Sequence, residues 1–149
     1  MNANRALLLA TSALSLYGVG QVWLVQLSSY RLWTRVGASE FSAYHAVWWR
    51  SIWGVVLGPA ALVVVGAFVM PWLPPPGAPI WAPWVGCGLQ TALMVGTAFW
   101  WGPLMARIEA PEGGVRRDRY KLLMSTHWLR VAIVTAFGAL TLWMVAQGG

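Results

Sequence analysis

The chain has 149 residues, of which 58% are hydrophobic and 9% are charged. A soluble domain carries far more charge, so this composition places the protein in the membrane class. The net charge of +6 would point to nucleic acid in a soluble protein. Here the basic residues border apolar stretches, where lipid headgroups account for them. We therefore expect the lipid bilayer as a partner and no nucleic acid.

The cysteine and acidic residues exclude two further classes. Cys87 is the only cysteine, so an intramolecular disulfide and a thiol-pair redox relay are excluded. Proton pumps and cation transporters normally need an ionisable group at membrane depth. None of the four acidic residues lies in the middle of an apolar run, which disfavours that class; these residues are Glu40, Glu109, Glu112 and Asp118.

Four apolar stretches follow one another along the chain. A helix rises about 1.5 Å per residue, so each stretch is long enough to cross roughly 30 Å of hydrocarbon. We predict one all-α domain over residues 1–149, a polytopic membrane protein. It is expected to be an antiparallel up-down-up-down bundle of four transmembrane helices. The predicted spans are about 6–30, 51–73, 83–106 and 126–147.

Prolines mark the predicted spans and one connection. Pro59 removes a backbone hydrogen bond, and its ring clashes with the carbonyl of Val55, so a kink is expected there. Pro103 should bend or weaken the last turn of the third span. Residues 70–79, MPWLPPPGAP, cannot continue a helix and should connect the second and third spans.

The basic residues are distributed asymmetrically. By the positive-inside rule, connections rich in Lys and Arg face the cytoplasm. Only Arg5 lies on the opposite side, so both termini are predicted outside the cytoplasm, in a multi-pass protein of the bacterial cytoplasmic (inner) membrane. The remaining nine basic residues border the first and third connections: Arg31, Arg35, Arg50, Arg107, Arg116, Arg117, Arg119, Lys121 and Arg130.

A candidate site gathers at the cytoplasmic ends of the second and fourth helices. Antiparallel packing could bring His45 near His127. Two histidines with Glu40 would match a transition-metal site, since imidazole and carboxylate are usual ligands for iron or zinc. His45 and His127 would act either as metal ligands or as acid and base, and Tyr44 is the candidate proton donor. Two arginines, Arg50 and Arg130, are the candidates that hold an anionic or enolate-like substrate.

Each of these residues also has a structural interpretation. The histidines would then hydrogen-bond within the bundle, and the two arginines would anchor lipid headgroups. Tyr44, Trp48 and Trp49 would belong to an aromatic belt at the membrane surface. Polar residues of the first helix, namely Tyr17, Gln21 and Gln26, would join helices by hydrogen bonds.

Short motifs also carry a family resemblance. They lie in residues 26–52, QLSSYRLWTRVGASEFSAYHAVWWRSI, in PLMARI from Pro103 and in THWLR from Thr126. The chain resembles small bacterial four-helix membrane proteins similar in layout to the anthrone oxygenase-like family. In that group an F-x-x-Y-H element corresponds to Phe41, Tyr44 and His45, and a W-x-R element to Trp128 and Arg130. The polar residue expected after the third-span proline is replaced here by Leu104 or Met105.

Two functions from different classes follow. In the first, the protein is an oxidoreductase-type enzyme that acts on a hydrophobic substrate at the cytoplasmic side. In the second, it is a non-catalytic accessory or assembly subunit of a larger membrane complex, which its short loops and abundant Trp favour. A channel or transporter fits less well, because no inverted repeat or broken pair of helices is evident. The partners would be other membrane subunits or a second copy of the chain.

Overall fold

A computed structural model of the chain describes residues 2–148. Within that range the chain forms four long helices and no strand, which confirms the all-α prediction. The first three helices each contain one π-helical turn, and the fourth is uninterrupted. Their parts are α1 (Ala3–Leu24), a π-turn (Val25–Ser29) and α2 (Tyr30–Trp33); α3 (Phe41–Ile52), a π-turn (Trp53–Leu57) and α4 (Gly58–Val69); α5 (Trp81–Gly96), a π-turn (Thr97–Trp101) and α6 (Gly102–Ala106); and α7 (Arg117–Gln147).

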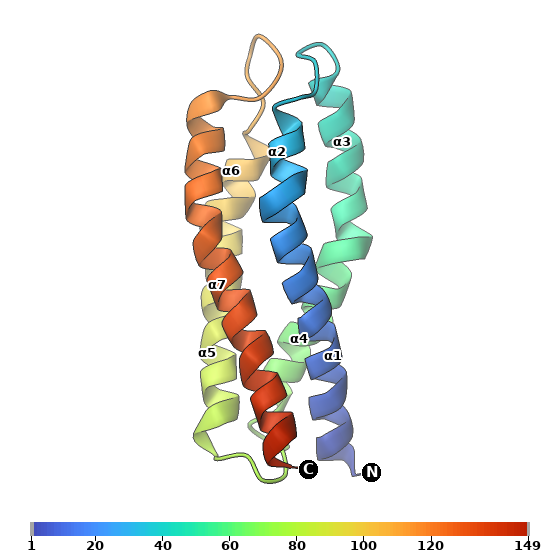
Figure 1. Cartoon of the computed structure of the whole chain (residues 1–149), viewed down its shortest axis with the longest axis vertical. Coiled ribbons are helices and arrows are strands. Elements are labelled where there is room, and N and C mark those ends of the chain that lie inside the picture. The colour runs from blue at the N-terminus through green and yellow to red at the C-terminus, as the bar shows by residue number, and fades with distance from the viewer. Residues whose placement is uncertain (1, 149) are drawn as a thin grey trace.

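The four helices lie side by side in a long, narrow bundle (Figure 1). Both chain ends lie at one end of the bundle, next to the connection between α4 and α5. The connections 34–40 and 107–116 lie together at the other end, which we call the basic end. The bundle therefore has two chemically different ends.

Three of the four helices are long and apolar enough to cross a membrane, namely Ala3–Trp33, Phe41–Val69 and Arg117–Gln147. The helix over residues 81–106 is not among them, because its tryptophans, glycines and Gln90 lower its mean hydropathy. The second helix ends at Val69, so residues 70–73 of the predicted second span lie outside it.

π-turns lie directly before the two prolines at which the sequence predicts a kink or a weakened turn. A π-turn ends directly before Gly58 and Pro59, and another ends before Gly102 and Pro103. In each, the glycine N–H bonds to the carbonyl five residues earlier, which widens the helix where a proline ring would otherwise clash. Both helices continue beyond their prolines.

At the first of these prolines, side chains of α1 supply the hydrogen bonds that the Val55 carbonyl cannot receive from residue 59. Pro59 has no N–H to donate to this oxygen. Tyr17 Oη donates to it at 3.0 Å, and Gln21 Nε2 donates to it at 2.9 Å. Tyr17 and Gln21 therefore join α1 to the second helix, which confirms their predicted role as interhelical contacts.

Close packing holds α1, α4 and α7 together in the half of the bundle near the chain ends. The buried core there is apolar and consists of Leu8, Val63, Ala67, Met70, Ala82, Phe137 and Met144. Beside it, Ser15 Oγ and Thr141 Oγ1 form a buried hydrogen bond of 3.0 Å between α1 and α7. Gly66 lets α4 approach α1, because a Cβ at this position would collide with the Thr11 hydroxyl.

Because α4 lies this close to α1 at Gly66, we expect Gly66→Ala to destabilise the protein. The added methyl group must displace Thr11 in a packed interface, which we expect to cost about 1–3 kcal/mol in the free energy of unfolding. The matched control is Gly88→Ala, since no atom lies within 4 Å of a Cβ there. Thermal unfolding in detergent measures both, and equal midpoints for the two variants would contradict the predicted close contact.

Candidate functional site

Aromatic side chains fill the interior near the basic end. Tyr30 and Trp33, on α2, are both buried and their ring centroids lie 4.7 Å apart. Trp48 of α3 packs edge-on against Trp33 at 4.7 Å and lies 6.2 Å from Tyr30. These contacts attach α3 to the rest of the bundle. We define the aromatic cluster as Tyr30, Trp33, Phe41, His45, Trp48 and Trp101.

His127 is buried beside this cluster, with 1% of its surface exposed. Its Nδ1 lies 2.8 Å from Oε1 of Gln26, and the Gln26 amide donates from Nε2 to the Met124 carbonyl at 3.2 Å. An amide oxygen can only accept, so Nδ1 carries the proton and Nε2 keeps its lone pair. The Tyr30 ring lies edge-on to the imidazole, with centroids 5.0 Å apart. The side chain is therefore held in one orientation and one tautomer.

His45 lies in a different part of the same cluster. Its imidazole is stacked between Phe41 at 5.6 Å and Trp48 at 5.9 Å, and Trp33 meets it edge-on at 5.4 Å. Its Nε2 atom is buried and has no hydrogen-bond partner. His45 and His127 are thus connected through the rings of Trp33 and Tyr30 rather than through a shared ligand.

Arg130 is half-buried one turn beyond His127 on α7. Its guanidinium lies over the Trp101 ring, 5.8 Å from the centroid. A cation over an indole face is attracted by the ring, so Trp101 holds the charge inside the bundle. Within residues 2–148 the one ion pair joins Arg116 and Asp118, so no carboxylate of that range pairs with Arg130.

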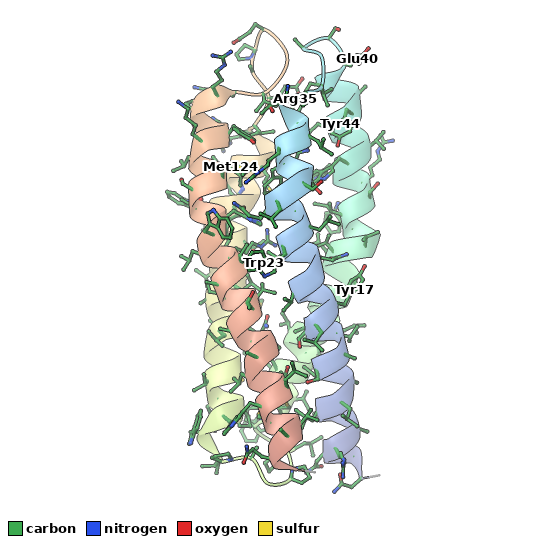
Figure 2. All side chains as sticks on the ribbon, viewed as in Figure 1. Tyr17, Trp23, Arg35, Glu40, Tyr44 and Met124 are labelled. Carbon is green, nitrogen blue, oxygen red and sulfur yellow. The ribbon has the colours of Figure 1, made fainter. Side chains whose placement is uncertain are left out.

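The other predicted site residues lie apart from His127. Glu40 is exposed at the outer edge of the basic end, and Tyr44 follows it on α3 (Figure 2). Arg50 is exposed, and neither Tyr44 nor Arg50 forms a side-chain hydrogen bond within residues 2–148. In the same range no three His, Cys, Asp or Glu side chains are arranged to hold a metal ion. The structure therefore does not bring His45, His127 and Glu40 together as metal ligands.

The interior of this region is rich in hydrogen-bond donors that lack acceptors. The indole Nε1 atoms of Trp33 and Trp101 are buried donors without partners. Nε2 of His45 is also buried without a partner, and it is a donor or an acceptor according to the tautomer. Tyr30 Oη donates to the Met105 sulfur at 3.0 Å, a weak acceptor. A molecule that brought carbonyl or anionic oxygens here would satisfy groups that the chain itself leaves unpaired.

Four residues of the site were not predicted from the sequence. Tyr30, Trp33, Trp101 and Met105 lie in or next to apolar runs, where nothing distinguishes them from lipid-facing side chains. Trp48 was interpreted as a belt residue but is part of the cluster. In the structure, Gln26 and Trp101 both lie in π-turns, which occur frequently at functional sites, but the sequence pattern did not reveal these turns.

Chemically, the arrangement offers a base and a cation on one helix. Nε2 of His127 can accept a proton, and the Arg130 guanidinium can hold a negative oxygen. His127 and Arg130 are three residues apart on α7 and share a face. The surrounding rings leave His127 only 1% exposed, so water has little access to it.

Comparison of the chain with protein-family models, with curated proteins and with solved structures finds no match. The resemblance to the anthrone oxygenase-like family therefore remains an expectation from the motifs.

The contact between Gln26 and His127 predicts energetic coupling between α1 and α7. Gln26→Leu leaves the Nδ1–H of His127 buried and unpaired, which we expect to cost about 1–3 kcal/mol in the free energy of unfolding. His127→Leu should likewise leave the side-chain oxygen of Gln26 without a hydrogen-bond donor. In the double variant neither group is left unpaired, so its loss should be smaller than the sum of the two single losses. Strictly additive losses in thermal unfolding would contradict the hydrogen bond.

Proposed function

We propose that this chain is an integral protein of the bacterial cytoplasmic membrane in which all four helices, including residues 81–106, span the bilayer as an antiparallel bundle. Large apolar side chains are exposed along every helix, for example Leu24, Val47, Phe99 and Leu129. A lipid environment removes the cost of exposing them to water. Exposed tryptophans next to the 70–80 connection, Trp72, Trp81 and Trp84, suit an aromatic belt.

The proposed orientation puts the basic end in the cytoplasm and both termini outside. Its support is the asymmetry of the basic residues between the two ends of the bundle.

Labelling of single cysteines tests this orientation. In a Cys87→Ser background, Pro79→Cys and Glu112→Cys place thiols at exposed positions of opposite ends. A membrane-impermeant maleimide should label the first variant in intact cells and the second only after the membrane is opened. Labelling of the position 112 variant in intact cells would overturn the orientation.

For the activity, we propose an oxidoreductase-type enzyme that acts on a hydrophobic, enolisable molecule between the helices near the basic end. The observation that carries this proposal is the buried His127, held by Gln26 so that Nε2 is the proton acceptor. Arg130, on the same face of α7, supplies the positive charge for the enolate oxygen. The unpaired indole N–H of Trp101 is available to the same oxygen or to a second carbonyl.

The resemblance to the anthrone oxygenase-like family supports a reaction of this kind. In such a reaction, Nε2 of His127 removes a proton from the CH₂ group of an anthrone, and Arg130 stabilises the resulting enolate. Molecular oxygen is the oxidant: anthrone and O₂ give anthraquinone and water, so the CH₂ group becomes C=O. The role of the chain in this scheme is to bind, to orient and to move the proton.

Anthrone itself is the probe for this proposal. Protein in proteoliposomes is expected to accelerate anthraquinone formation by about 10²-fold or more over empty liposomes, as expected for a positioned base. His127→Gln should remove that acceleration, and Arg130→Gln should reduce it strongly. Absorbance of anthraquinone and oxygen uptake measure the rate. Arg50→Gln is the matched control, because it removes the same charge from an exposed position of α3.

A wild-type protein that is no faster than empty liposomes would overturn the enzymatic proposal for this substrate class. The alternative is a non-catalytic accessory subunit. The exposure of α3 favours it, because Phe41 is the only buried residue among residues 41–52. Stable recovery of another membrane protein with the wild-type chain, lost on substitution of exposed α3 residues such as Val47, would then establish the accessory role.

A further inference from the structure

Apart from the tryptophans at the end with the chain termini, each of the four helices carries one exposed tryptophan nearer the basic end. We call these four side chains the tryptophan girdle: Trp23, Trp53, Trp100 and Trp128. Trp23 and Trp128 meet edge-on, with ring centroids 5.7 Å apart. Trp100 Nε1 donates to Thr126 Oγ1 at 3.3 Å, close to Trp128 on α7. These three tryptophans therefore lie at one height of the bundle.

Trp53, of the second helix, lies at the same height. Gln21 of α1 donates to the Val55 carbonyl at 2.9 Å, so these two positions face each other. Trp23 and Trp53 both lie close to this contact, each on the side that leads to the 34–40 connection at the basic end (Figure 1). The girdle thus surrounds the bundle with one side chain from each helix.

The exposed surface of α7 changes its chemistry at the girdle. From Trp128 to Ala146, none of the exposed residues carries a charge or a hydroxyl group. An apolar surface suits hydrocarbon, whereas charged groups need water or lipid headgroups. Such groups are exposed on α7 only on the basic side of the girdle, at Arg117, Asp118, Lys121 and Ser125.

The surface of the second helix changes in the same way at Trp53. Its exposed polar residues end with Arg50 and Ser51, and none of the exposed residues from Trp53 to Val69 carries a charge or a hydroxyl group. On the first and third helices, the exposed hydroxyls of Tyr17 and Thr91 donate to backbone carbonyls. These hydroxyls therefore need no water as a partner.

The helices are longer than the hydrocarbon of a bilayer is thick. α7 has 31 residues and extends over about 46 Å, against roughly 30 Å of hydrocarbon. At the end with the chain termini, Trp143 stacks on Trp81 with centroids 5.6 Å apart, so these two mark the opposite belt. From Trp128 to Trp143 the helix rises about 22 Å, and from Trp81 to Trp100 about 28 Å. The two belts are thus nearly one hydrocarbon thickness apart, and the excess of helix lies on the basic side.

We propose that the headgroup layer of the cytoplasmic leaflet surrounds the tryptophan girdle and that the bundle beyond it projects from the hydrocarbon. This inference rests on the proposed membrane insertion and orientation, and it names the surface that contacts the headgroups. Tryptophan rings favour this layer, and Arg50 lies about one turn beyond Trp53, at the depth of the lipid phosphates. The projecting part extends about 16 Å along α7.

The interior of the projecting part fits an aqueous environment. Its large apolar side chains include four that are fully buried, so their surface is withdrawn from water: Trp33, Phe41, Ile108 and Leu123. Between the two belts, by contrast, large apolar side chains such as Val65 and Phe99 are exposed, which suits hydrocarbon.

The girdle also gives the depth of His127. This histidine directly precedes Trp128 on α7, so it lies at the level of the headgroup layer. A hydrophobic molecule that enters from the bilayer can thus present a polar oxygen to His127 while its apolar part stays at the depth of the hydrocarbon. The substrate class of the proposed enzyme is therefore an amphipathic membrane molecule.

Nitroxide labels on two exposed valines of the second helix test the position of the bilayer. Val47→Cys and Val65→Cys, each in a Cys87→Ser background, lie on opposite sides of Trp53. The full chain is reconstituted in liposomes, and electron paramagnetic resonance measures the collisions of each label with oxygen and with a water-soluble nickel chelate. Oxygen concentrates in hydrocarbon, whereas the chelate stays in water.

The ratio of the two collision rates should reverse between these positions, with the chelate favoured at position 47 and oxygen at position 65. Val47 is a demanding position, because its exposed apolar side chain alone would favour hydrocarbon. The matched pair on α7, Leu122→Cys and Ala136→Cys, should show the same reversal across Trp128. Agreement between the two helices would locate the headgroup layer at the girdle.

Two different failures can be distinguished. If the labels at positions 47 and 122 meet oxygen and the chelate as those at 65 and 136 do in hydrocarbon, the bilayer covers the basic end and the girdle proposal is overturned. Membrane insertion would then still stand. If the chelate also reaches positions 65 and 136, the proposed insertion itself is overturned, and the girdle proposal with it.

Discussion

The hydrogen bond between His127 and Gln26 is the constraint on which the rest of the site depends. It joins α7 to the first helix inside an apolar bundle, where both groups would otherwise be left without partners. Tyr30 packs edge-on against the same imidazole, and Trp33 lies next to Tyr30 one turn later on α2. Trp33 and Trp48 then attach α3. Near the basic end, aromatic packing thus holds α3, whereas a polar contact holds α7 there in addition to the apolar core nearer the chain ends.

The π-turns change which face of a helix points to each neighbour. An α-helix advances about 100° per residue, so one extra residue in a turn rotates everything after it by about that angle. In the first helix, Tyr17 and Gln21 lie before the π-turn and face Val55, while Gln26 lies within it and faces His127. One helix therefore presents polar groups to two different neighbours.

The interior near His127 contains hydrogen-bond donors without acceptors. These donors are the Trp101 indole N–H, which has no partner, and the Arg130 guanidinium, which lies over the Trp101 ring. The four carboxylates of the chain all lie near the basic end, so the oxygen atoms of a bound molecule would supply acceptors for these donors.

The sequence by itself determined the helical architecture and the chemical difference between the two ends. Long uncharged runs predict helices, and prolines and glycines limit them, because these effects are local. One of its two interpretations also had His45, His127 and the polar residues of the first helix form hydrogen bonds within the bundle. Only the tertiary structure decided their partners: His127 pairs with Gln26, and His45 is enclosed by rings. A 3.6-residue repeat cannot give that answer, since each π-turn shifts the face that follows it. The burial of Tyr30, Trp33 and Trp101 depends on which helices become neighbours, and no local pattern encodes that choice.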